Sequence, residues 1–327
     1  MDLSFVAIAA LSGLLLSFVR WFISPYIQYK MRSRAQDYEH TENGKTLIQK
    51  QEIGTPFLLR EAENARVGLS LVVPAFNEQD RLPHMLKSHI QYMREQQKAG
   101  TLPSKIEILV VDDGSRDVTW TIIKQWCAKT ANDKDIRVRG FRQKQNKGKG
   151  MAVKNGMLYS KGDYVLMVDA DGATDFKEIP KIYQQCVSGR NKDGLSCAIG
   201  SRNHPDNAGQ VQRKGIRKLL NFCLTTLIRF VLGFSIQDTQ CGFKIFSREA
   251  AKRVFPIQHL ERWAFDIEIL YLCRSIGIPV SEMAVRWHDV DGSHLNIFDA
   301  SLSMARDMLM VKTLYILGVW SVSDADW

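Results

Sequence analysis

Short apolar runs alternate with amphipathic segments from residue 68 to about residue 170. The runs are rich in β-branched and aliphatic residues, as in 68–75 (GLSLVVPA), and are typical of buried strands. Predicted strands are 68–75, 106–111, 136–141 and 164–168, and predicted helices are 79–98 and two that begin near 117 and 148. This alternation predicts an α/β fold: a Rossmann-like, mostly parallel sheet with helices on both faces.

The second half of the chain has a less regular pattern. A helix over 213–232 begins with basic residues and continues with apolar ones, and further helices are predicted from 247 and over 265–276. A strand is expected at 280–287. The apolar helix 298–319 is interrupted by charged residues, so we expect the C-terminal part, 297–327, to lie in a membrane interface or against the domain.

The N-terminal segment 3–19 carries no charged side chain and is extended by apolar residues beyond Arg20. It is just long enough to span a bilayer, which predicts a single transmembrane anchor within 1–29. A cleaved signal peptide fits less well, because no basic residue precedes the apolar run. Basic residues follow at Lys30, Arg32 and Arg34, so the positive-inside rule places the rest of the chain in the cytosol. We expect 30–67 to be a juxtamembrane connector and 68–296 to be the globular domain.

The composition indicates the charge of the binding partner but not its chemical class. The 327 residues carry a formal net charge of +9, which suggests an anionic partner: a nucleic acid, a phosphorylated substrate or a membrane surface. Nucleic-acid binding is not expected, because basic residues are not interleaved with aromatic ones. Six scattered cysteines, with no zinc-like spacing, predict reduced thiols.

Two carboxylates, Asp169 and Asp171, follow the predicted strand 164–168. At a strand end they can converge on one point, and such oxygen ligands suit Mg²⁺ or Mn²⁺. The other interpretation is a turn with solvated acids, since this pattern is common by chance.

Three further motifs follow predicted strands or begin a predicted helix. They are 74–78 (PAFNE), 112–115 (DDGS) and 146–150 (NKGKG). The acids can bind a base or ribose, and the glycine- and lysine-rich motif can seat a diphosphate at a helix N-terminus. A helix start, an Asx turn and a solvated basic turn are the respective alternatives. Ligands of such sheets bind beyond the carboxyl ends of the strands, where all four motifs are expected.

In this order and spacing, SLVVPAFNE, VVDDGSRD, NKGKG and VDADGA resemble the inverting GT-A glycosyltransferases of family 2. DTQCGFK, WAFDIE and WHDVDGS resemble the polyprenyl-phosphate branch of that family, and the details of the second half are similar to its dolichyl-phosphate β-glucosyltransferases. The resemblance extends from about residue 69 to the C-terminal helix. It implies a GT-A fold and a sugar nucleotide as donor.

The resemblance also implies roles for individual residues. Donor binding would involve Pro74, Phe76, Glu78, Asp112, Asp113, Lys149 and Asp169, with Asp169 and Asp171 holding the metal. The acceptor phosphate would be bound by Arg202, Arg213 and Lys244, with Arg217 one helical turn after Arg213. The catalytic set would be Asp171, Arg202, Lys244 and Asp266. Two positions depart from related enzymes: Ala173 replaces a metal-ligating glutamine of mannosyl enzymes, and His294 replaces a frequent lysine.

The implied reaction is an inverting transfer of glucose from UDP-glucose to dolichyl phosphate, which supplies protein N-glycosylation. A phosphate monoester has a second pKa of about 6, so it is largely a dianion at neutral pH and needs no general base. Asp238 and Asp266 would then orient basic residues or bind sugar hydroxyls. The implied location is the endoplasmic reticulum membrane, with the domain facing the cytosol.

Alternatives stay open at this point. A GDP-mannose-dependent dolichyl-phosphate enzyme or another polyprenyl-phosphate transferase keeps the fold and changes the substrates. A processive polysaccharide synthase lacks support, because the chain has neither several spans nor a Gln-x-x-Arg-Trp motif. A non-catalytic sugar-nucleotide-binding protein is disfavoured by the intact acids. A homo-oligomer is compatible with the sequence.

Overall fold

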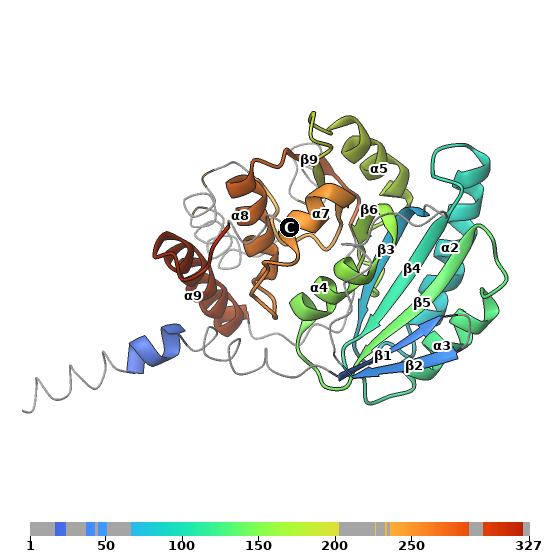
Figure 1. Ribbon diagram of the computed structural model, residues 1–327, viewed down its shortest axis with the longest axis horizontal. Helices are drawn as coiled ribbons and strands as arrows, with labels where there is room; N and C mark the ends of the chain where they lie inside the picture. Colours follow the sequence, from blue (N-terminus) through green and yellow to red (C-terminus); the bar gives the residue numbers. More distant parts are fainter. Residues whose placement is uncertain are drawn as a thin grey trace, which may run out of the picture.

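Nine strands in the described part of the chain form one mixed sheet, in the order β2-β1-β5-β4-β3-β6-β8-β7-β9 (Figure 1). The computed structural model describes residues 17–23, 37–42, 45–50, 67–202, 226, 233, 236–287 and 297–322. The strands are β1 (Asp37–Glu42), β2 (Lys45–Lys50), β3 (Val67–Ala75), β4 (Ile106–Asp112), β5 (Ile136–Gln143), β6 (Gly162–Met167), β7 (Cys197–Ser201), β8 (Lys244–Ser247) and β9 (Val280–Ala284). The helices are α2 (Leu82–Lys98), α3 (Thr119–Lys129), α4 (Lys149–Tyr159), α5 (Ile179–Ser188), α7 (Arg248–Val254), α8 (Phe265–Ile276) and α9 (Ile297–Ile316).

The centre of the sheet is parallel, which confirms the α/β prediction. β5, β4, β3 and β6 run in one direction, so their carboxyl ends meet at one edge. β8 then pairs with β6 in the antiparallel direction, with Met167 opposite Lys244. Because of this reversal, the start of β8 lies at the same edge as the end of β6.

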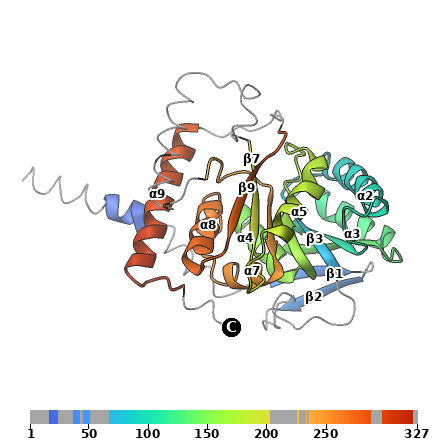
Figure 2. The same cartoon turned by 90° about the horizontal axis from the view of Figure 1, so that it is seen from above.

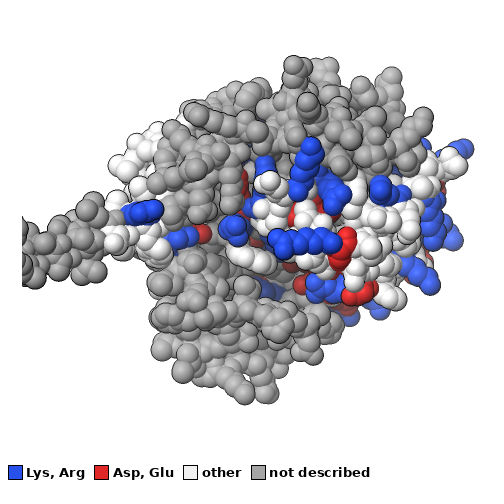
Figure 3. All heavy atoms as spheres, turned by 90° about the horizontal axis from the view of Figure 1, so that it is seen from below, with Lys and Arg blue, Asp and Glu red and all other residues white. Residues whose placement is uncertain are grey.

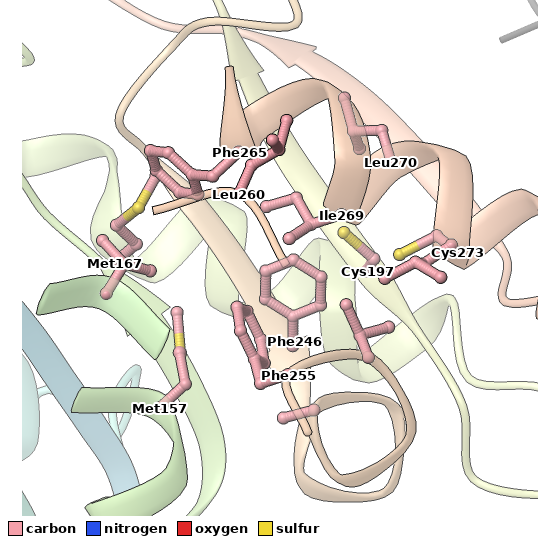
Figure 4. Close-up of a cluster of buried hydrophobic side chains, with 14 of the residues drawn as sticks. Met157, Met167, Cys197, Phe246, Phe255, Leu260, Phe265, Ile269, Leu270 and Cys273 are labelled. Atoms are coloured by element: carbon pink, nitrogen blue, oxygen red, sulfur yellow. The ribbon is translucent and has the colours of Figure 1, made fainter. Parts of the chain in front are cut away.

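Helices cover both faces of the sheet, and each face has its own hydrophobic core. One core lies under α2, α3 and α5, and the other lies under α4, α7 and α8. Figures 1 and 2 show the two groups of helices on opposite sides of the strands. In the second core, Leu260, Phe265 and Ile269 lie close to Phe246 and Phe255 (Figure 4). This packing fixes α8 against the sheet edge that carries the motifs.

The connector expected over 30–67 differs in part from the structure. Residues 37–42 and 45–50 form the hairpin β1–β2, and β1 pairs with β5 in the antiparallel direction. The two segments are polar and short, as is common for edge strands, so they lack the apolar run by which buried strands are predicted. The short strands β7 and β8 and helix α5 were not predicted either.

The segments for which a membrane contact is predicted are 1–29 and 297–327. Among the described residues, no helix combines the length and apolarity needed to cross a bilayer. The predicted anchor is described only over 17–23, a helical segment that contacts α9 through Trp21, 5.1 Å from the Arg306 guanidinium. Residues 288–296 and nearly all of the predicted helix 213–232 lie outside the described residues. The five described cysteines are buried, and none of them forms a disulfide.

Candidate functional site

The loops that follow β3 and β4 are bound to each other at the carboxyl edge of the sheet. The Asn77 amide donates to Ser115 Oγ at 2.9 Å, and Asn77 Oδ1 accepts from the Arg116 amide at 2.9 Å. The Glu78 amide donates to Thr119 Oγ1 at 2.8 Å. These contacts bring the PAFNE and DDGS motifs together. Pro74 is the last but one residue of β3, and Phe76, which follows the strand, is exposed.

Asp113 fastens the glycine-rich loop to the end of β4. Its carboxylate accepts hydrogen bonds from the amides of Lys147 and Gly148, both at 2.8 Å, and from Gln143 Nε2 at 3.1 Å. Burial raises its pKa to about 6, although the two amides oppose this. Its neighbour Asp112 is also buried and accepts from the Ser115 amide. Both carboxyls support loops, and their expected contact with a nucleotide stays a prediction.

The glycines of 146–150 allow the backbone of 260–262 to approach α4 closely. A Cβ on Gly148 would lie 2.7 Å from the Glu261 carbonyl oxygen, and one on Gly150 would lie 2.6 Å from that of Leu260. The Met151 amide donates to the Glu261 carbonyl at 2.9 Å. The first turn of α4 is therefore in contact with protein backbone, and donor binding by Lys149 stays a prediction.

Lys149 and Asp169 form an ion pair at the end of β6, with 2.5 Å between Nζ and Oδ1. Burial opposes the charge of Lys149, but the nearby carboxylates Asp169 and Asp266 outweigh it and raise the lysine pKa. Asp171 lies two residues further on, and its Oδ1 accepts from the Ala173 amide. Burial raises the pKa of Glu78, and the charge of Asp171 adds to this. The PAFNE and DxD motifs lie at the same sheet edge, because β3 and β6 are parallel neighbours.

Behind this pair, Lys244 and Asp266 form a fully enclosed ion pair. Lys244 Nζ donates to Asp266 Oδ1 and to the Cys241 carbonyl, both at 2.6 Å, and the lysine has no exposed surface. Burial raises the pKa of Asp266, against the effect of Lys244 and Lys149. The ammonium group faces these protein oxygens, and the expected contact of Lys244 with an acceptor phosphate stays a prediction.

Arg202 is a partly exposed basic residue near these pairs. Its side chain and amide donate three hydrogen bonds to Asp238, at 2.6 to 2.9 Å, and its guanidinium lies 5.5 Å from the Trp287 ring. Burial would raise the pKa of Asp238, but Arg202 lowers it below its ordinary value. Asp238 therefore orients Arg202. The other predicted phosphate ligands, Arg213 and Arg217, lie outside the described residues.

Sequence reasoning missed Gly242, which determines how closely β8 approaches the DxD motif. A Cβ at this position would lie 1.9 Å from Asp169 Oδ2. The close approach follows from the pairing of Met167 with Lys244. No pattern in the sequence predicts this pairing. Trp263 was also missed: its exposed ring lies 5.9 Å from Lys149 Nζ.

The site can accommodate a polyanion together with a divalent cation. No group of three or more His, Cys, Asp or Glu residues in the described ranges could hold a metal by itself. A cation at Asp169 and Asp171 would therefore take its other ligands from phosphate oxygens and water, as Mg²⁺ commonly does. Ala173 is buried and offers no ligand. The oxygen donors present fit Mg²⁺ or Mn²⁺.

Comparisons with known proteins agree on one class. The family model described as glycosyl transferase family 2 matches residues 70–255. A dolichyl-phosphate β-glucosyltransferase of Dictyostelium discoideum is 42% identical over 255 residues, covering 78% of this chain and 76% of the relative. The protein of that name from Drosophila melanogaster is 38% identical, covering 98% and 94%, and the one from Homo sapiens is 40% identical, covering 77% of each chain.

Solved structures give weaker matches. A structure described as that of a mycobacterial protein is 20% identical with a TM-score of 0.49, covering 86% of this chain and 83% of that one. Glucosyl-3-phosphoglycerate synthase from Mycobacterium tuberculosis, in complex with UDP, is 19% identical with a TM-score of 0.47, covering 75% and 79%.

Proposed function

The chain belongs to glycosyltransferase family 2, and we propose that it transfers glucose from UDP-glucose to dolichyl phosphate with inversion at the anomeric carbon. Relatives named for this activity, at 38 to 42% identity over most of the chain, support the choice of sugar and acceptor. The structural observation that carries the proposal is the Lys149–Asp169 pair at the carboxyl edge of the sheet, beside the DxD acids.

At the donor end, the described residues can bind and neutralise a diphosphate. Mg²⁺ or Mn²⁺ held by Asp169 and Asp171 would supply charge neutralisation for the departing UDP. Lys149 is positioned by Asp169 and, in this proposal, exchanges that carboxylate for a phosphate oxygen when the donor binds. The raised pKa of Lys149 keeps it cationic at neutral pH. Glu78 and the loop held by Asp113 would border the nucleotide.

At the acceptor end, alignment of a phosphate dianion replaces general-base catalysis. Asp238 has a lowered pKa and three donors from Arg202, which makes it a poor proton acceptor. Asp266 is paired with Lys244 and contributes to the field around Lys149. In this proposal Arg202 binds the acceptor phosphate, with Arg213 and Arg217 as further predicted ligands, and Asp266 and Lys244 hold the site together from behind.

The proposal places the catalytic site at the cytosolic face of the endoplasmic reticulum membrane. Support comes from apolar side chains exposed near each end of the chain. Those exposed are Phe18, Val19 and Trp21 in 17–23, and Leu309, Ile316, Leu317 and Val319 in and after α9. The face in Figure 3 carries many Lys and Arg side chains, with Asp and Glu among them. Apolar residues beside basic ones suit an interface with anionic lipid.

The test of the proposed function is lipid-linked sugar formation by the detergent-purified full chain. Dolichyl phosphate is supplied with radiolabelled UDP-glucose or GDP-mannose, with Mg²⁺, with Mn²⁺, or with EDTA. We expect glucose transfer that EDTA abolishes and that either added metal restores. Transfer from GDP-mannose would assign the sister activity, and transfer that persists in EDTA would overturn the metal assignment. No lipid product from either donor would overturn the proposal.

Gly242→Ala is expected to reduce transfer strongly while the protein stays folded. The new methyl group would meet the Asp169 carboxylate and displace it from Lys149. Because a displacement of about 1 Å can cost roughly a hundredfold in rate, we expect a decrease of this order in kcat. Gly189→Ala at the end of α5, where the nearest atom is 3.0 Å away, is the matched control. Equal kcat values for the two variants would refute this role of Gly242.

A further inference from the structure

The segment 256–262 lies between α4 and α8 and is held by α4 on one side. Lys154 Nζ donates to the carbonyls of Pro256 at 3.0 Å and Gln258 at 2.6 Å. Gln258 Nε2 returns a hydrogen bond to the Gly150 carbonyl at 3.0 Å. Burial removes water from the Lys154 ammonium group and lowers its pKa to about 8. The two carbonyl oxygens accept the hydrogen bonds that water would otherwise accept. The segment is therefore fixed to the first two turns of α4.

On the other side, Glu268 of α8 gathers the hydrogen-bond donors of the same segment. This glutamate is fully buried and accepts from the amides of His259, at 2.8 Å, and Leu260, at 2.6 Å. The His259 ring Nδ1 lies 2.9 Å from Glu268 Oε1, and Tyr315 donates to the same oxygen at 3.1 Å. A buried carboxylate with so many donors is an organising centre, since its removal would leave several polar groups unpaired.

The end of segment 256–262 contacts the residues on both sides of Lys149, whose ammonium group is the positive charge at the proposed donor site. The Glu261 carbonyl accepts from the Met151 amide, and the backbone of 260–262 leaves no room for a side chain at Gly148 or Gly150. Lys149 lies between these two glycines. A shift of the segment would therefore move the first turn of α4, and with it the Lys149 ammonium that pairs with Asp169.

We propose that Glu268 is a positioning residue for the transfer reaction: by fixing segment 256–262 it holds Lys149 at the diphosphate site. This inference rests on the proposed function. Two carboxylates, Asp266 and Glu268, occupy the first turn of α8, where the helix dipole favours anions. Asp266 pairs with Lys244. Glu268 instead binds the backbone amides of His259 and Leu260, and through this segment it holds Lys149.

The test is a double-mutant cycle between Glu268→Gln and Lys149→Met in the full chain. The readouts are UDP affinity by titration calorimetry with Mn²⁺, and kcat and donor KM for glucose transfer. Glu268→Gln alone is expected to weaken UDP binding and lower kcat by about tenfold each, as for residues in one network. In the Lys149→Met background, the same change should have almost no further effect on UDP affinity.

Glu107→Gln is the matched control for this cycle. Glu107 is also buried and accepts from Ser70 Oγ, Arg139 and the Lys161 amide, but it lies near the start of β4, at the opposite edge of the sheet. Its loss should lower the melting temperature without changing UDP affinity, with or without Lys149. If Glu268→Gln behaved like this control, the positioning role would be overturned. Wild-type protein that binds no UDP would instead overturn the proposed function.

Tyr315→Phe provides a milder variant in case Glu268→Gln does not fold. It removes one donor to Glu268 and keeps the ring that packs beside Trp320. Its control is Tyr164→Phe. Tyr164 lies on β6, and the change removes a hydroxyl group that accepts a hydrogen bond from Arg190 at 3.3 Å. We expect a decrease of about threefold in UDP affinity for Tyr315→Phe alone, which disappears when Lys149 is Met. Equal UDP affinities for the two phenylalanine variants would contradict the proposal.

Discussion

Asp169→Asn is expected to reduce glucose transfer by about three orders of magnitude, the upper range for the loss of one electrostatic group in an active site. The carboxylate of Asp169 pairs with Lys149 and lies against Gly242, so the amide would occupy the same space without the charge. It would also remove one of the two proposed metal ligands. The loss should appear in kcat and be accompanied by weaker Mn²⁺-dependent UDP binding.

The measurement is initial-rate formation of radiolabelled glucosyl lipid, with circular dichroism and a thermal melt to show that the variant is folded. Asp193→Asn, in an exposed turn between α5 and β7, serves as the matched control. We expect this control to retain wild-type kcat. A folded Asp169→Asn protein with more than about a tenth of wild-type kcat would be incompatible with the donor site described above.

Lys244→Met is expected to lower the free energy of unfolding by about 3 to 5 kcal/mol, the usual result of breaking a buried ion pair from one side. The lysine is fully buried, and its removal leaves Asp266 without the ammonium group 2.6 Å away. Urea denaturation of the purified variant measures this loss. Lys129→Met, on the last turn of α3 at the surface, is the control and should change the stability by less than about 0.5 kcal/mol.

Replacing both partners separates the stability of this pair from its function. In Lys244→Met/Asp266→Leu, two apolar side chains take the place of the two charges, and Leu branches at Cγ as Asp does, so we expect most of the lost stability to return. Activity should not return, because Asp266 is one of the two carboxylates whose charge acts on Lys149, and the double variant lacks it. A stable double variant with wild-type kcat would show that the pair serves only the fold.

The sequence is sufficient to predict the central sheet, because its strands are long, apolar and separated by helices with clear periodicity. β4 is buried along its whole length, and its predicted bounds differ from the observed ones by one residue. The meeting of the PAFNE, DDGS and DxD loops follows from the parallel arrangement alone. Predictions for residues at strand ends therefore required no knowledge of side-chain contacts.

Other features depend on contacts that have no local signal. Gly242 lies in a turn whose partner is Asp169, more than seventy residues earlier, and only the antiparallel pairing of β8 with β6 brings the two together. Lys244 carries the same charge as Arg202, yet one is enclosed and the other reaches the surface. The β1–β2 hairpin is built from polar segments that pair at an edge. In each case tertiary context, and not composition or periodicity, determines the role.

The reversal of direction at β8 separates the site into two parts that come from different stretches of the chain. Residues that leave β3, β4 and β6 form one wall, and residues that enter β8 form the other. An exchange of 236–244 between homologues would therefore replace one wall without altering the strands that carry the other. For protein engineers, this boundary defines a natural unit for recombination: chimaeras joined here keep the strands that carry the PAFNE, DDGS and DxD motifs and exchange the residues that contact Arg202 and Asp169.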